Sequence, residues 1–201
     1  MRSDPLRRRL ARATFFASAI ACCALLLASI WPGVLDQFFF GLPALLLSLP
    51  LFFLWIAWVA AVAVFEITGQ SKGAPRRRWG QNAALLVTAS LISVGFHLPK
   101  RIAFGAVDRQ FASLLTEAPS AGSSYVALDR EIGLYRVNAV GRDPRGGVFF
   151  RTHRGPAGLF DEMSYGFAWR PNEQGSPFGS AAYNWRPLFG DWYVFAASND
   201  W

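Results

Sequence analysis

Residues 10–31 read LARATFFASAIACCALLLASIW, an apolar stretch whose one charged side chain is Arg12. A helix of about 20 apolar residues matches the hydrocarbon thickness of a bilayer, so this stretch predicts a membrane span. Residues 42–67 and 83–98 have the same apolar character and predict a second and a third span. We therefore expect a transmembrane region of three α-helices over residues 1–101.

The charged side chains are distributed unevenly along the chain. The formal net charge is +7, and residues 1–101 hold eleven basic and three acidic side chains. Residues 102–201 are consequently close to neutral, which is unlike the basic surface that binding to phosphate groups requires. We therefore expect no nucleic-acid partner.

Basic side chains flank the predicted spans on one side. They precede the first span and fill the second connection, as Arg7, Arg8, Arg9, Arg12, Lys72, Arg76, Arg77 and Arg78. Short cytoplasmic segments carry this bias, so three crossings predict a cytoplasmic N-terminus and an extracytoplasmic domain over residues 102–201. Arginine outnumbers lysine, which favours a bacterial source, and we expect a multi-pass protein of the bacterial cytoplasmic membrane that contacts membrane lipid.

An alternative interpretation of the N-terminus is a cleaved leader. Ala19 to Cys22 weakly resembles a lipoprotein cleavage site behind a basic, apolar leader. The apolar run continues past Cys22 to Ile30, whereas a tethered lipoprotein would become polar there, so an uncleaved span is favoured. The two cysteines, Cys22 and Cys23, both lie in this stretch, and the C-terminal domain is expected to fold without disulfides.

Small side chains recur at helical spacing along the first span. They are Ala13, Ala17, Ala21, Ala24 and Ala28. A ridge of small residues allows another helix to approach closely. The ridge packs either on the second span of the same chain, which we favour, or on a helix of a different membrane subunit.

The predicted spans carry almost no ionisable side chains at membrane depth, which argues against a transporter or a pump. His97, at the end of the third span, is a possible ligand for a haem or pigment metal because neutral imidazole binds metals. An interfacial histidine is the simpler interpretation. The sequence predicts no bound cofactor and no metal site.

Residues 102–201 show the pattern of an α+β domain. Apolar residues recur at helical period over residues 101–117, which predicts one amphipathic helix. Alternating patterns and turn residues then follow, with strands expected at 125–128, 132–140, 148–153, 163–170, 182–189 and 192–197. The first of these is weak, and we expect an antiparallel sheet of about five strands.

One cluster in this domain has side chains suited to chemistry or binding. It comprises Arg151, His153, Arg154, Asp161 and Glu162. His153 could act as a base that Asp161 or Glu162 orients. No nucleophile motif, phosphate-binding loop or metal-ligand spacing accompanies it, so we favour charges that pair with one another.

The residue patterns predict a binding role in preference to an enzyme. We expect a membrane-anchored extracytoplasmic binding or scaffolding module, an accessory subunit of a larger membrane-protein complex. The alternative is a membrane-tethered enzyme of hydrolase type that uses the His153 loop. A concave pocket converging on His153 would favour this alternative.

Overall fold

The structure is a computed structural model that describes residues 5–35, 49–68, 78–120, 125–156 and 162–198. Its helices are α1 (Pro5–Ala28), α3 (Leu49–Thr68), α4 (Trp79–Gly95), α5 (Leu98–Gly105) and α6 (Asp108–Ser113), followed by the short 3-10 helix η2 (Leu114–Thr116). Its strands are β1 (Val126–Ile132), β2 (Tyr135–Arg142), β3 (Val148–Pro156), β4 (Glu162–Trp169), β5 (Ala182–Phe189) and β6 (Trp192–Ser198).

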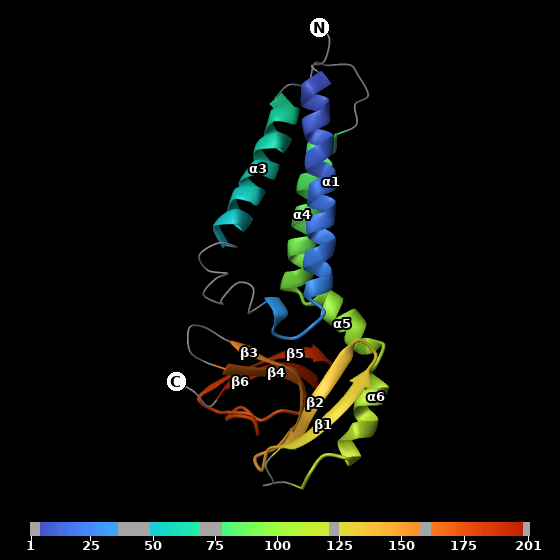
Figure 1. The fold of residues 1–201 in the computed structure, drawn as a ribbon, viewed down its shortest axis with the longest axis vertical. Helices are drawn as coiled ribbons and strands as arrows, with labels where there is room; N and C mark the ends of the chain where they lie inside the picture. The colour runs from blue at the N-terminus through green and yellow to red at the C-terminus, as the bar shows by residue number, and fades with distance from the viewer. Residues whose placement is uncertain (1–4, 36–48, 69–77, 121–124, 157–161, 199–201) are drawn as a thin grey trace.

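Three helices pack side by side and project from the sheet as an elongated bundle (Figure 1). The contact between α1 and α4 is made by small buried side chains, among them Cys22 and Ala83, which allow the two helices to lie close together. The indole Nε1 of Trp58 on α3 donates a 3.2 Å hydrogen bond to the hydroxyl of Thr14 on α1. The helical part therefore has its own small core.

The prediction of three transmembrane helices is wrong, because the described helices do not all have the length and hydropathy that a membrane span needs. Arg9–Ala28 in α1 is long and apolar enough to cross a membrane. The fully described apolar part of α3, Pro50–Val64, is too short, and α4 qualifies only if it is joined to α5 across a 59° bend. The described residues thus contain one candidate span, or two if that bent pair counts as one.

The bend after α4 has a local cause in the backbone. His97 adopts a left-handed conformation with φ 56°, and α4 ends at Gly95 after 17 residues. At about 1.5 Å per residue, a helix of that length is shorter than the roughly 30 Å hydrocarbon layer. The sequence indicated apolar composition over residues 83–98, but it did not reveal where the straight helix stops.

The single amphipathic helix predicted over residues 101–117 is also divided. α5 ends at Gly105, and Val107, with φ −128° and ψ 4°, separates it from α6. Glycine has a low helix propensity, which is consistent with a break at this point. Phe104, Phe111 and Leu114 are nevertheless buried, so the apolar stripe faces the core.

The sheet has six strands in the order β1-β2-β3-β4-β6-β5, and every neighbouring pair is antiparallel. The antiparallel prediction is confirmed, and the expected number of about five strands was too low. The additional strand is β1, which the sequence indicated only as a short segment. Gly133, with φ 57°, reverses the chain between β1 and β2, a conformation that glycine adopts readily.

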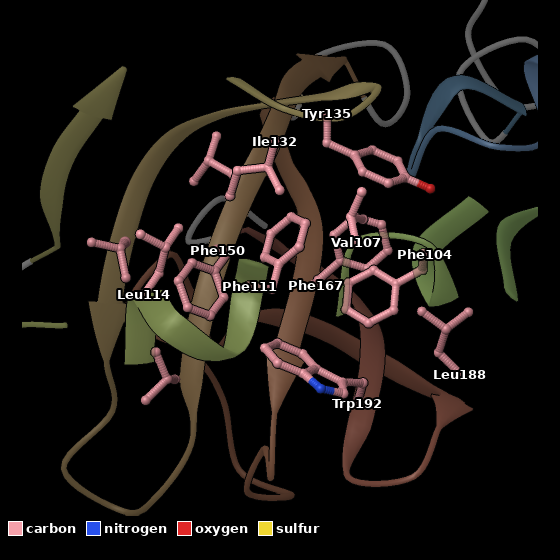
Figure 2. Close-up of a cluster of buried hydrophobic side chains, with 13 residues drawn as sticks. Phe104, Val107, Phe111, Leu114, Ile132, Tyr135, Phe150, Phe167, Leu188 and Trp192 are labelled. Carbon is pink, nitrogen blue, oxygen red and sulfur yellow. The ribbon is translucent and has the colours of Figure 1, made fainter. Parts of the chain in front are cut away.

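The two faces of the sheet have separate cores. On one face, α5 and α6 bury Phe104 and Phe111 against Phe150, Phe167 and Trp192 (Figure 2). These rings meet at centroid distances of 4.5–6.0 Å, within the range that favours edge and tilted aromatic contacts. The sheet and its helices are therefore joined by an aromatic core that needs no disulfide.

The opposite face is covered by a smaller cluster. Phe178, from the connection between β4 and β5, stacks on Phe195 with centroids 5.8 Å apart. Phe149 contacts Phe195 edge to face at 5.2 Å. No helix is described over this face, so its outer part carries the polar side chains considered below.

The segment that directly follows α1 packs on the sheet domain. Ile30 and Trp31 pack against the large aromatic core, and Trp31 Nε1 donates a 2.9 Å hydrogen bond to the carbonyl of Leu134. A Cβ at Gly33, which has φ +83°, would overlap the ring of Tyr165. The bundle and the sheet are thus joined by close packing as well as by the covalent connection through α5.

Candidate functional site

Three of the five predicted cluster residues lie on β3 and one lies at the start of β4. Arg151, His153 and Arg154 belong to β3, and Glu162 is the first residue of β4. Asp161 lies outside the described residues. The cluster therefore sits at one end of the central strand pair.

A β-bulge decides which of these side chains share a face. The register of β3 against β4 shifts between Arg151 and His153, so that Arg151 pairs with Gly166 and Arg154 pairs with Ser164. In a regular strand, residues three apart point to opposite faces. The extra residue of a bulge reverses that relation, and both arginines reach the same side of the sheet.

These two arginines line a pocket of about 200 Å³ on the sheet face that α5 and α6 do not cover. Its other polar lining comes from Glu162 and Ser164 on β4. The lining is completed by Tyr125, Pro177 and Phe178. The pocket thus combines two guanidinium groups, one carboxylate and one hydroxyl with aromatic walls.

Arg151 is held in place by neutral groups. Its Nε donates a 2.7 Å hydrogen bond to Asn138 Oδ1. Its guanidinium carbon lies 5.1 Å from the ring centre of Tyr125 and 5.0 Å from that of Phe178, the geometry of cation–π contacts. Within the described part of the chain, no carboxylate pairs with Arg151, so its charge is not neutralised there.

Arg154 has a different environment. Its Nε lies 2.6 Å from Glu162 Oε1, and the two side chains are 55% and 48% exposed. This ion pair therefore stands at the rim of the pocket, where solvent weakens it. Arg151, Arg154 and Glu162 together leave one net positive charge among the titratable side chains that line the pocket.

His153 does not join the pocket. It pairs with Tyr165 across the strands, and the two rings stack with centroids 6.2 Å apart and planes 28° apart. Directly paired residues share a face, and the ring of Tyr165 lies close to Gly33 in the segment that follows α1. The structure therefore places His153 on the face toward α1 and separates it from Glu162.

The alanine ridge of α1 is not buried against the other helices. Ala13, Ala17 and Ala24 are exposed, and Ala21 and Ala28 are partly exposed. The contact with α4 uses the neighbouring stripe that contains Cys22. Within the described residues, the ridge is thus exposed or partly exposed.

His97 lies at the break between α4 and α5, where its left-handed backbone turns the chain. Its backbone N–H donates to the carbonyl of Val94 at 2.9 Å, and its carbonyl accepts from Arg101 at the same distance. This position gives His97 a structural role at the bend. The described residues contain no group of three or more His, Cys, Asp or Glu side chains placed to hold a metal ion.

The shifted pKa values belong to structural groups outside the pocket. Burial raises the pKa of Asp143, but hydrogen bonds and charge from Arg145 outweigh this effect and leave it below its usual value. Burial raises the pKa values of Tyr135 and Tyr183 well above the usual range. These shifts move titration away from neutral pH, which is the opposite of what a general acid or base requires.

Three residues that contact Arg151 were missed in the sequence. Asn138, Tyr125 and Phe178 come from β2, from the residue before β1 and from the β4–β5 connection, which are distant along the chain. No local motif in the sequence links these residues to Arg151. Comparison of the chain with family models, curated proteins and solved structures gives no match.

Proposed function

We propose that the protein is a membrane-anchored binding module, with α1 as its anchor and the six-stranded domain held outside the cytoplasm. The observation that carries this proposal is the docking of Ile30 and Trp31 on the aromatic core. An anchor that is also packed on the domain holds a binding surface at a fixed height above a membrane. A flexible linker would not do so.

The proposed orientation in the membrane depends on α1 alone and does not depend on how many helices cross the membrane. The basic residues Arg7, Arg8, Arg9 and Arg12 lie at one end of α1, and the sheet contacts the other end. The positive-inside bias assigns the basic end to the cytoplasm. The sheet domain would then face the extracytoplasmic side of a bacterial cytoplasmic membrane.

The open surface of α1 supports association with lipid and with a partner subunit. Ile20 is 74% exposed and Leu27 is 58% exposed beside the uncovered alanine ridge. A continuous apolar helix surface in water would be unfavourable. We therefore propose that lipid chains and a helix of a neighbouring subunit cover it. An accessory subunit of a larger membrane complex is the role that these features fit best.

The arrangement favours binding over hydrolysis. A general base must lie within hydrogen-bond reach of the group that orients it and of the substrate. The side chains of His153 and Glu162 lie on different faces of the sheet. The pocket is lined by Glu162 and not by His153. The pocket therefore offers recognition groups, with Glu162 as its described carboxylate and without the predicted His153–Glu162 pair.

A cysteine-accessibility experiment tests the orientation. Cys22 and Cys23 are replaced with serine, and single cysteines are introduced as Glu173→Cys in the sheet domain and Ser3→Cys near the N-terminus. A membrane-impermeant maleimide should label Glu173→Cys in intact cells and Ser3→Cys only after lysis. The reverse pattern, or release of the protein by alkaline carbonate, would disprove the proposal.

The binding role is tested by crosslinking in native membranes. A photoreactive residue at Ala17 on the open ridge should capture a membrane protein, while the same residue at Val87 on the buried α4 face should give only intramolecular products. Equal capture from both positions, or a monodisperse monomer with no crosslinked partner, would contradict an accessory-subunit role.

A further inference from the structure

We propose that the pocket between Arg151 and Arg154 binds the carboxylate group of a small organic monoacid. This inference gives the proposed binding module a ligand, and to that extent it rests on the function proposed above. It is carried by the bulge in β3, the neutral surroundings of Arg151 and the net charge of the pocket.

The bulge in β3 brings Arg154 to the same face as Arg151. Without the register shift between Arg151 and His153, Arg154 would point to the other face of the sheet. Bulges of this kind are common next to functional sites because they redirect a side chain. Gly166 permits the close strand approach here, since a Cβ at that position would collide with the carbonyl of Phe150. The bulge thus brings two guanidinium groups to one pocket.

Arg151 is held in one orientation by neutral groups. Its Nε is engaged by Asn138, and its flat surface is engaged by Tyr125 and Phe178. Within the described residues, its terminal Nη donors have no hydrogen-bond partner. A guanidinium held in one orientation with free donors matches the two oxygens of a carboxylate, which accept such bonds in pairs.

The charged side chains of the pocket favour a monoanion over a dianion. Two arginines and Glu162 leave one positive charge in the pocket, which one carboxylate neutralises. A phosphate dianion would leave excess negative charge beside Glu162 and is therefore disfavoured. The volume of about 200 Å³ is below the usual size of a drug-binding pocket, so the ligand is small.

The Arg154–Glu162 pair sets the affinity. Glu162 occupies part of the hydrogen-bonding capacity of Arg154 and repels an incoming anion. A bound carboxylate would accept hydrogen bonds from Arg154 at the rim in place of some that Glu162 accepts. Its other oxygen would accept from Arg151. Removing the charge of Glu162 should therefore strengthen anion binding, and removing Arg151 should weaken it.

The test is calorimetric titration of the full chain in mild detergent with propionate, benzoate and phosphate at constant ionic strength. We expect saturable binding of a carboxylate and at least tenfold weaker binding of phosphate. Arg151→Lys should weaken carboxylate binding at least tenfold, because lysine keeps the charge but loses the planar fork. Glu162→Gln should strengthen binding severalfold.

Matched controls separate the site from general charge effects. Arg136→Lys, at an exposed ion pair of β2, should leave binding unchanged, and the thermal midpoints of all variants establish that they fold. A tripeptide with a free C-terminal carboxylate, compared with its amide, distinguishes a chain terminus from a free acid as the source. Binding of the free acid or the free terminus supports the proposal.

Phosphate binding as tight as carboxylate, an amide that binds as well as the acid, or an unchanged affinity in Arg151→Lys would overturn the proposal. No measurable binding of any carboxylate would also overturn it. These results leave maleimide labelling and partner capture unaffected, so failure of the ligand assignment is distinguishable from failure of the membrane-anchored binding role.

Discussion

Trp31 and Leu134, which are 103 positions apart in the chain, are joined by a 2.9 Å hydrogen bond from the indole Nε1 to the backbone carbonyl. Trp31 follows the end of α1, and Leu134 lies in the turn between β1 and β2. The bond and the packing of the indole on the core connect the apolar helix to the sheet. The relation of anchor to domain is therefore part of the tertiary structure.

Replacing Trp31 with phenylalanine should cost about 0.5–1 kcal/mol of unfolding free energy, because it removes one solvent-exposed hydrogen bond and keeps an aromatic ring. Trp31→Ala should cost more, since it also removes apolar contact. Chemical unfolding in mild detergent measures both. Equal stability of the alanine and phenylalanine variants would contradict packing of this ring on the core.

Gly33→Ala should destabilise the protein by about 2–4 kcal/mol, because the residue has φ +83° and the added methyl would meet the Tyr165 ring. Gly105→Ala is the matched control. Nothing lies within 4 Å of a Cβ at Gly105, and alanine favours helix, so its stability should be unchanged or slightly raised. Thermal unfolding of the two variants provides the comparison.

Phe111→Ala should cost about 3–5 kcal/mol, the usual loss for a fully buried phenylalanine. The side chain is 0% exposed, and its ring contacts Phe104, Tyr135 and Phe167. Ile102→Ala on the preceding helix, at a site 75% exposed, should change stability by less than about 0.5 kcal/mol in detergent. Similar losses for both would mean that α6 does not pack on the sheet.

Acid should weaken the protein partly through Asp143. Its carboxylate is 3% exposed and accepts hydrogen bonds from the backbone N–H and the guanidinium of Arg145 at 2.8–2.9 Å. Because its folded pKa lies below the unfolded value of about 3.9, its contribution is present above that pH and disappears as pH falls through the folded pKa.

Asp143→Asn should therefore lower stability at pH 7 by about 1–2 kcal/mol and reduce the further loss on acidification. Unfolding curves between pH 7 and pH 3 measure the difference. Asp129→Asn serves as the control because its ion pair with Arg136 is exposed on both sides, and it should have little effect at pH 7. A larger effect of Asp129→Asn would show that the burial of Asp143 does not matter.

Ser18→Ala should stabilise the helical bundle by roughly 0.5–1 kcal/mol. The Ser18 hydroxyl is buried between helices and has no hydrogen-bond partner among the described residues. Removing an unsatisfied buried hydroxyl avoids its desolvation cost. Thr14→Ala, which removes the acceptor of the Trp58 indole, should have the opposite sign. Both effects are measured by thermal unfolding in detergent.

Local pattern was sufficient for much of the secondary structure. Alternating patterns and turn residues predicted the strands that form β4, β5 and β6, because strand period and turn chemistry depend on neighbouring residues. Apolar composition identified α1 as a helix able to span a membrane. It did not identify helix ends, which depend on backbone conformations such as that of His97.

The site depended on contacts that no short stretch of sequence contains. The residue types around 151–162 indicated charged side chains suited to binding. The bulge that groups Arg151 with Arg154 and separates His153 arises from the pairing of β3 with β4. The aromatic contacts of Arg151 come from Tyr125 and Phe178, which lie near it only in the folded sheet domain. Composition and periodicity by themselves indicated most of the strands and the apolar character of the helices. Tertiary packing decided where the helices end and which side chains meet, because side-chain direction follows strand register.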